Sequence, residues 1–424
     1  MAKKEKKFIS SLSMNSKEVT SVLKQKIEEE KEEAKKNQTK ESINFEKNLF
    51  LNAKYDASKI NILSLFSGAG GLDLGTELAA INQYFGEKAF YSSYNNKKEF
   101  HKFANEILNV VYSNDNYMAA NLSYKRNLLA HGIQDTRDIR KVTHFPKSDL
   151  MLGGFPCPGF SVAGPRLLDD PRNFLYVHYI RALMDSKPLV FIAENVKGLT
   201  TMAHGQVLQQ IKEDFAAAGY YVTVQLLNAE NYYVPQSRER VFIVGVRNDI
   251  HEEYQYEYPL PITGTLQEPL VTLSDAIGDL PKNPKDVFDS SYSSMYMSRN
   301  RKKGWNDVSY TIQASGRQAP QYPGGEPMKK VSSTEWIFQG NLNRRLSVRE
   351  CARIQTFPDW FEFSDGNREN VSENNRLNEK YKQIGNAVPV LLAKYVTSYV
   401  LDYLIDRLSI SANPELLNSK SVRL

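Results

Sequence analysis

The sequence has only two cysteines, Cys157 and Cys351. Two cysteines cannot form the disulfide framework of a small secreted domain, so we expect a reducing compartment. The six histidines are scattered and no Cys/His cluster has metal-ligand spacing, which argues against a zinc site. Apolar runs such as 189–193 are too short to span a bilayer, and the N-terminus has no run long enough for a signal peptide. The expectation is a cytoplasmic protein with neither a metal nor a membrane partner.

The sequence also lacks a large excess of either positive or negative residues. Lys and Arg number 54 against 49 Asp and Glu, giving a net charge of +5 and a pI of about 8.8. This balance is compatible with a nucleic-acid partner but does not demonstrate one. The chain does have a hydrophobic content of 41% over 424 residues, enough for two or three domains with a buried core.

Residues 1–58 form a charged N-terminal extension with few large apolar side chains. Val19, Leu23 and Ile27 recur every four residues, which allows a short helix, but the apolar stripe ends there. A solvated and partly disordered extension is the main interpretation. An arm that binds a partner or contacts DNA is the alternative.

Residues 59–247 have the pattern of an α/β domain. Continuous apolar runs predict strands that are buried on both faces, and helical periodicity predicts helices between them. The predicted strands are 61–66, 109–114, 149–154, 188–195, 222–228 and 240–246, and the clearest helices are 173–186 and 205–218. This alternation favours right-handed crossovers and a doubly wound sheet, in which ligands bind at the carboxyl ends of the strands.

The rest of the chain divides into two parts. Residues 248–343 are rich in Pro, Tyr, Ser and basic residues, and we interpret them as a smaller, irregular domain. Residues 344–424 regain a helical pattern, and a final helix from about Val388 to Leu408 is expected to return to the α/β domain. Residues 82–107 have the character of an insertion.

Glycines follow the first predicted strand, in LFSGAGGLDLG at 65–75, and bring backbone amides close to a ligand. Asp73 replaces the third glycine of the dinucleotide fingerprint, and a phosphate-binding Gly-Lys-Ser/Thr is missing. We favour a nucleotide-type cofactor over a merely structural turn. Asp115 can accept hydrogen bonds from a ribose and Asp138 one from an adenine amine, although each alone is more often a surface aspartate.

Further polar residues follow the later strands. Cys157 lies in GGFPCPGFS, a rigid turn that suits a nucleophilic thiol better than a core cysteine. Glu194 ends an apolar strand, where burial would raise its pKa and make it a proton donor; a helix cap is the alternative. Arg238 and Arg240 lie on one side of an extended segment and suit phosphate or carboxylate recognition, although surface ion pairs are commoner.

Taken in order, these segments resemble the motifs of the cytosine-5 DNA methyltransferases. The resemblance covers roughly residues 60–248 and 344–400 and is carried by LFSGAGG, SNDN, GGFPCPGFS, ENVKG, QSRER, RRLSVRECARIQTFP and YKQIGNAVP. QSRER matches the family's Gln-x-Arg-x-Arg motif residue for residue. Pro158 stands where Gln is usual after the nucleophile, and Asp115 where Glu is common.

The resemblance implies a Rossmann-like sheet that binds S-adenosylmethionine and leaves S-adenosylhomocysteine as the product. The implied cofactor-binding residues are Phe66, Ser67, Gly68, Ala69, Gly70, Gly71, Leu72, Asp115, Asn116, Asp138, Ile139, Gly154, Pro156, Leu175, Asn386, Ala387 and Val388. The Cys157 thiolate would add to carbon 6 of a flipped-out cytosine while Glu194 hydrogen-bonds or protonates nitrogen 3. Asn195 would orient the base or its loop, and Arg238 and Arg240 would hold the base carbonyl and a phosphate.

The smaller domain then becomes the target-recognition domain. The expected DNA contacts are Ser161, Ala163, Arg166, Arg299, Arg301, Lys302, Lys303, Arg317 and Gln318. Residues 297–320 resemble the target segment of methylases that modify GC-centred palindromes such as GGCC or AGCT. The resemblance thus implies a monomeric modification enzyme of a bacterial restriction–modification system, acting on double-stranded DNA at the site of a cognate endonuclease.

Cys351 falls on a helix that begins with a capping box of Ser347 and Glu350, and we expect it to be structural. Three alternatives to the DNA methyltransferase were weighed. A transfer-RNA cytosine-5 methyltransferase would carry a Cys-Phe-Thr tripeptide that the sequence lacks. A nicotinamide-dependent dehydrogenase leaves Cys157 and Glu194 unexplained, and a catalytically dead DNA-binding protein would not need them.

Overall fold

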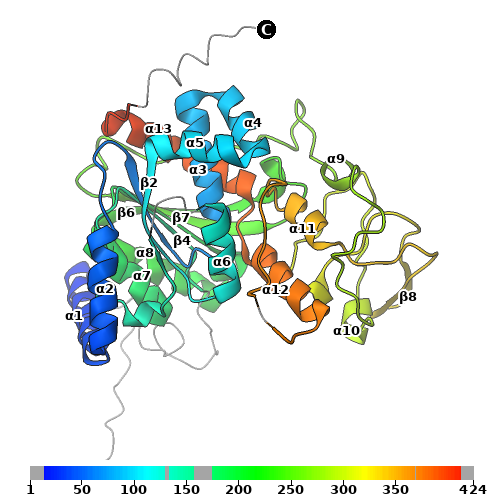
Figure 1. Cartoon of the computed structure of the whole chain (residues 1–424), viewed down its shortest axis with the longest axis horizontal. Coiled ribbons are helices and arrows are strands. Elements are labelled where there is room, and N and C mark those ends of the chain that lie inside the picture. Colours follow the sequence, from blue (N-terminus) through cyan, green and yellow to red (C-terminus); the bar gives the residue numbers. More distant parts are fainter. Residues whose placement is uncertain (1–13, 129–132, 157–173, 368, 412–424) are drawn as a thin grey trace, which may run out of the picture.

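The structure is a computed structural model, and it describes residues 14–128, 133–156, 174–367 and 369–411. A seven-stranded sheet lies at its centre with helices on both faces, and the smaller domain lies to one side (Figure 1). This arrangement confirms the predicted α/β class.

The order of the sheet is β3-β2-β1-β4-β5-β7-β6. The strands are β1 (Ile60–Leu65), β2 (Leu108–Asn114), β3 (Gln134–Asp135), β4 (Leu150–Gly153), β5 (Val190–Val196), β6 (Tyr220–Asn228) and β7 (Glu239–Arg247). The first five run parallel, and the order reverses from β1 to β4. In such a sheet, the carboxyl ends at the reversal are where a ligand binds.

The last strand differs from the expected pattern of crossovers. β7 lies between β5 and β6 and is antiparallel to both. The connection 229–238 is shorter than the dozen or so residues that a parallel crossover needs, so the two strands form a hairpin.

Helices cover each face of the sheet and bury most of the central strands β1, β4, β5 and β7, whereas the edge strand β6 is partly exposed. Along β5, Val190 and Ile192 belong to one apolar core, whereas Phe191 and Ala193 belong to the other. One face carries α3 (Gly71–Phe85), α5 (Lys97–Ile107) and α13 (Val390–Arg407), and the other carries α7 (Phe174–Ser186) and α8 (Gln206–Ala217). Both-sided burial explains why the strands read as continuous apolar runs.

The N-terminal extension differs from the favoured interpretation of a solvated, partly disordered segment. It forms two helices, α1 (Ser16–Lys36) and α2 (Lys40–Asn52), which lie against the domain (Figure 1). The stripe of Val19, Leu23 and Ile27 is buried, and α1 packs on α7 and α8. The stripe is short, but tertiary packing on an existing apolar face stabilises such a helix more than its own propensity does.

The 82–107 region completes α3 and adds α4 (Glu87–Asn95) and α5, which pack on α3. Near the end of the chain come α11 (Val348–Ile354), α12 (Glu373–Asn386) and α13. The stretch Glu373–Arg407 is long and apolar enough to cross a membrane by composition alone, yet 61% of its most apolar window is buried. It comprises two helices, and α13 packs along α3 as a core helix of the sheet domain.

The smaller domain has little regular structure, as predicted. It contains α9 (Leu273–Ile277), α10 (Ser294–Met297) and a ribbon of β8 (Lys329–Ser332) and β9 (Glu335–Ile337). The domain contacts α11 and α12, which therefore lie between it and the sheet domain (Figure 1).

Candidate active site

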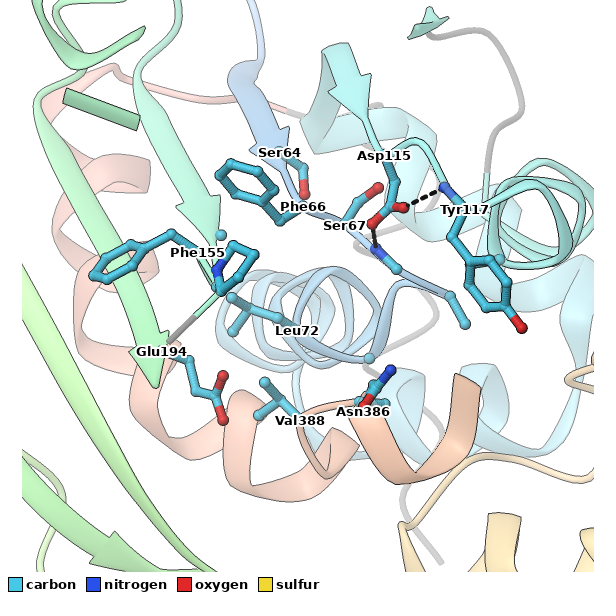
Figure 2. Close-up of a pocket in the computed structure, with 18 of the residues that line it drawn as sticks. Ser64, Phe66, Ser67, Leu72, Asp115, Tyr117, Phe155, Glu194, Asn386 and Val388 are labelled. Carbon is cyan, nitrogen blue, oxygen red and sulfur yellow. Dashed lines mark hydrogen bonds between the residues drawn. The ribbon is translucent and has the colours of Figure 1, made fainter. Parts of the chain in front are cut away.

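A cavity of about 560 Å³ opens at the carboxyl ends of β1, β2, β4 and β5. Figure 2 shows Phe66 and Asp115 on one side of it and Glu194, Asn386 and Val388 on the other. Its volume and position are those of a small-molecule site in an open α/β sheet. All but one of the predicted cofactor-binding residues line this cavity.

The backbone after β1 wraps around the cavity in strained or glycine-dependent conformations. Phe66 has φ +53°, a left-handed value that costs a non-glycine residue about 1–2 kcal/mol. Gly68 has φ +53° with open space where a Cβ would lie. Gly71 approaches the Val388 carbonyl, which a Cβ would meet at 2.4 Å. Strain at a ligand-facing turn is typical of a functional site.

Gly70 is the predicted cofactor residue that does not line the cavity. It has φ +89° and precedes α3, and a Cβ there would meet the Leu128 side chain at 2.3 Å. Its role is therefore to make the turn and to let α6 (Met118–Asn127) and its following residue approach.

Asp115 is fixed by the backbone on both of its carboxylate oxygens. Oδ2 accepts a hydrogen bond from the Gly68 amide at 2.9 Å, and Oδ1 accepts one from the Tyr117 amide at 2.7 Å (Figure 2). Burial raises the pKa of Asp115, and the two amides oppose this shift. Each oxygen retains an acceptor position, so the carboxylate is oriented to bind hydroxyl groups in the cavity.

The segment after β3 supplies another wall of the cavity through Asp138 and Ile139. The Asp138 side chain caps a short turn by accepting from the Arg140 amide, and it also pairs with the Arg140 guanidinium. Arg140 lowers the pKa of Asp138, which keeps the carboxylate ionised.

The cavity has the polar atoms that a nucleoside-type cofactor needs. Besides Asp115, the Ser67 hydroxyl faces it and is buried without a hydrogen-bond partner among the described residues. A buried hydroxyl of this kind is normally satisfied, so a ligand atom is a fitting partner. Within the described ranges, no group of three or more His, Cys, Asp or Glu side chains is placed to hold a metal ion.

The predicted nucleophile, Cys157, lies outside the described residues, as do Ser161, Ala163 and Arg166. The residues that lead to Cys157 are described: Phe155 is buried, and its carbonyl accepts a hydrogen bond from Asn195 Nδ2 at 3.0 Å. Asn195 thus ties the end of β5 to the backbone two residues before the cysteine.

Glu194 lies at the rim of the cavity and pairs with Arg240. Its Oε1 is 2.8 Å from Arg240 Nε, and only 12% of its side chain is exposed. Burial raises the pKa of Glu194, while the charges of Arg240 and Arg238 lower it. A Cβ added to Gly154, which follows β4, would lie only 3.1 Å from Glu194 Oε2. The segment leading to Cys157 therefore passes directly beside this carboxylate.

Arg238 takes a different role from the predicted contact with the base. Its guanidinium is buried and donates to the carbonyls of Ile312, Gly385 and Ala387 at 2.8–3.1 Å. Burial and the neighbouring Arg240 lower the pKa of Arg238 to about 9. With all three acceptors inside the protein, Arg238 joins β7 to the smaller domain and to the cavity wall after α12.

Two glutamines that are not among the predicted site residues complete this junction. Gln236 Oε1 accepts from the Ile312 amide at 2.8 Å, and its Nε2 donates to Gln355 Oε1 at 2.9 Å. Gln355 Nε2 in turn donates to the Ile384 carbonyl. Their signal in the sequence is their place in two motifs, since Gln236 is the Gln of QSRER and Gln355 is the Gln of ARIQTFP.

The predicted DNA contacts of the smaller domain divide into exposed and buried residues. Arg299 and Arg317 are exposed, Lys303 and Gln318 are half-buried, and Lys303 lies over the Tyr310 ring. Arg301 and Lys302 instead point inward, because Arg301 donates to the Tyr296 carbonyl and Lys302 to the Leu342 carbonyl. These two basic groups hold the loops of the domain together.

Cys351 is fully buried on α11, and burial raises the pKa of its thiol, which agrees with the expected structural role. The cavity also contains residues that the sequence analysis did not single out. Tyr117 and Lys382 lie together at its rim, with the Lys382 ammonium 4.1 Å from the centre of the Tyr117 ring.

Comparisons with known proteins identify the family of the chain. The profile of the C-5 cytosine-specific DNA methylases matches residues 60–401. The chain belongs to this family. It is 53% identical over 408 residues to the type II methyltransferase M.BsuRI of Bacillus subtilis, covering 95% of this chain and 91% of the relative. It is 52% identical to M.BspRI of Lysinibacillus sphaericus, covering 92% of each chain.

One solved structure supports the fold alone. A putative DNA modification methyltransferase encoded within an E. coli prophage superposes with a TM-score of 0.53 at 20% identity, over 83% of this chain and 100% of that one. As a member of the C-5 cytosine-specific DNA methylases with type II relatives, the chain is a DNA (cytosine-5) methyltransferase of the bacterial restriction–modification type. The dehydrogenase alternative is thereby excluded.

Proposed function

We propose that the enzyme transfers a methyl group from S-adenosylmethionine to carbon 5 of a flipped-out cytosine in a short double-stranded site, through a covalent adduct of Cys157. The observation that carries the proposal is the juxtaposition of Glu194 with the segment that leads to Cys157. A nucleophile and a proton donor on adjacent strand ends, at the mouth of a cofactor-sized cavity, suit covalent activation of a base.

S-adenosylmethionine, when bound, supplies the electrophilic methyl group for the reaction. We assign its ribose to Asp115 and its adenine to the region of Phe66, Asp138 and Ile139, with Ser67 and the Gly68 amide region near the methionine part. Asn386 and Val388 close the opposite wall. Burial of the cofactor among these residues keeps water from the reacting groups.

The residues of the chain act on the cytosine. The Cys157 thiolate adds its electron pair to carbon 6, and Glu194 gives a proton to nitrogen 3, so that carbon 5 becomes an enamine-like nucleophile. After carbon 5 is methylated, a water molecule takes the carbon 5 proton, the thiolate leaves carbon 6, and nitrogen 3 returns its proton to Glu194, which restores the aromatic ring. Arg240 positions Glu194 for this step, and the thiolate and the Glu194 proton are restored in each turnover.

The cytosine must leave the helix stack to reach this site, at a cost of a few kcal/mol. Recognition of the surrounding sequence falls to the smaller domain, where exposed Arg299 and Arg317 can contact phosphates or guanine edges. We propose a short GC-centred palindrome as the site, a monomeric enzyme in the cytoplasm, and an endonuclease that acts on the same sequence.

The test is transfer of labelled methyl groups to DNA of mixed sequence by the wild type and by Cys157→Ser, followed by bisulfite sequencing. Methylation of cytosine at one short motif by the wild type alone supports the proposal and identifies the site. Labelling of transfer RNA instead of DNA would contradict the proposal that the substrate is DNA. A Cys157→Ser variant that works at the wild-type rate would rule out the covalent step.

A further inference from the structure

The α1–α2 hairpin lies outside the residues that match the family profile, and the proposed chemistry does not use it. It nevertheless makes specific polar contacts with the sheet domain. Lys31 pairs with Asp185 on α7 at 2.7 Å, and Glu46 on α2 is 3% exposed. Buried carboxylates are rare without a partner. The partners of Glu46 therefore show which segment of the sheet domain the hairpin holds in place.

Glu46 holds the segment between β3 and β4. Its Oε1 accepts a hydrogen bond from the Thr143 amide at 2.8 Å and lies 3.7 Å from Arg137 Nη2. Arg137 in turn pairs at 2.6 Å with Asp135, the last residue of β3. One carboxylate of the hairpin is thus connected to both sides of Asp138 and Ile139, the two cavity-lining residues of this segment.

The segment depends on such support because it has little regular structure of its own. Between β3 and β4 the only helical residues are a single 3-10 turn, Ile139–Lys141. A segment without strand or helix bonds keeps its conformation through side-chain contacts from its neighbours.

Two further contacts come from the same hairpin. The Phe50 ring stacks on His144 with 3.9 Å between ring centres. Glu30 of α1 lies 3.7 Å from Nε2 of the buried His178 on α7, and α1 also contacts the 3-10 turn itself. From α7, Arg181 donates to the Ile139 carbonyl at 3.0 Å. The hairpin and α7 therefore both contact and support the 3-10 turn Ile139–Lys141.

We infer that the α1–α2 hairpin is a positioning element for the cofactor site, in which Glu46 fixes the backbone that presents Asp138 and Ile139 to the nucleoside part of the ligand. The inference rests on the proposed function, since it takes the adenosine end of S-adenosylmethionine as the group bound there. Glu46 touches no substrate and acts through Thr143 and Arg137.

The experiment compares Glu46→Ala with Glu41→Ala, which removes an exposed glutamate from the same helix. Calorimetry measures the affinity for S-adenosylhomocysteine, and hydrogen exchange reports on residues 133–149. We expect Glu46→Ala to weaken S-adenosylhomocysteine binding about 3- to 10-fold and to speed exchange in this segment, as loss of a charge-assisted hydrogen bond would. The KM for S-adenosylmethionine should rise, while kcat and the KM for DNA stay at wild-type values.

Glu46→Gln keeps an oxygen acceptor for the Thr143 amide and should recover much of the affinity, which a merely space-filling role would not predict. Unchanged S-adenosylhomocysteine affinity in Glu46→Ala overturns the inference. So does a parallel loss of cofactor affinity, DNA affinity and kcat with a lowered Tm, which indicates general damage. If the wild type itself fails to bind S-adenosylhomocysteine, the cofactor assignment fails, a separate outcome that also removes the basis of the inference.

Discussion

Arg240 Nε lies 2.8 Å from Glu194 Oε1 across two antiparallel strands, β7 and β5. The arginine therefore lowers the pKa of the carboxyl group that borders both the cofactor cavity and the segment leading to Cys157. Burial alone would raise the pKa of Glu194 further, and the arginine opposes this.

Replacing Arg240 with glutamine should raise the pKa of Glu194. With the ion pair gone, the buried carboxyl group binds its proton at higher pH, and a carbon-13 NMR titration of labelled glutamate follows this directly. Arg247→Gln, at the far end of β7 where the arginine pairs with Asp249, is the matched control. A Glu194 pKa that stays constant or falls in Arg240→Gln would contradict the electrostatic role.

Arg238→Met should destabilise the fold by about 3 kcal/mol, since three buried carbonyls lose a charged donor. Urea unfolding measures the change, and Arg299→Met, which replaces an exposed arginine, serves as the control within the smaller domain. If stability is preserved while DNA affinity falls, Arg238 contacts the substrate, as the sequence pattern first indicated.

Asp115→Asn should weaken S-adenosylhomocysteine binding about tenfold, or about 1.4 kcal/mol. Both carboxylate oxygens accept hydrogen bonds from backbone amides. In the asparagine variant the Nδ2 group must face one of these N–H donors, so one of the two hydrogen bonds that orient the side chain is lost. Calorimetry gives the affinity. DNA affinity should remain at the wild-type value, and a simultaneous loss of DNA binding would indicate wider disruption.

The buried His178 should make stability depend on pH. Burial and Arg181 lower the pKa of His178 to about 3, so the folded state keeps the ring neutral while the unfolded state protonates near 6.5. The facing charged groups are Glu30, Asp138, Arg140, Arg181 and Lys26. Because the folded pKa is depressed, stability is complete above about pH 6.5 and is lost as pH falls toward 3.

A His178→Leu variant should therefore lose less stability between pH 7 and pH 5 than the wild type. The wild-type slope from this residue is at most about 1.4 kcal/mol per pH unit. Unfolding free energies at the two pH values test the difference between the proteins. Equal losses in both would mean that other groups govern the acid sensitivity.

Much of the cofactor cavity follows from the sequence, because its residues are contiguous with strand ends. Phe66, Asp115 and Glu194 each follow or end a buried apolar run, and parallel strands bring such ends together. Gly70 was predicted to face the ligand but faces α6, since a glycine-rich loop does not reveal which glycine serves the turn.

Side-chain direction was harder to predict in the irregular regions. Arg301 and Lys302 belong to a basic run that suggests an exposed DNA contact, yet both donate to carbonyls inside the domain. Without strand or helix periodicity, nothing in the sequence separates inward from outward side chains. The contacts of Arg238 and Glu46 were hard to predict for another reason, because their hydrogen-bond partners lie far along the chain.

The pairing of α3 with α13 has a consequence for synthesis. Gln83 on α3 donates to the Ser398 carbonyl on α13, 315 residues later, and Gly71 touches the Val388 carbonyl. One wall of the ligand cavity is therefore translated hundreds of codons before the opposite wall. A ribosome-bound fragment that ends before residue 386 lacks a closed cavity, so the protein cannot enclose its ligand until both walls have emerged.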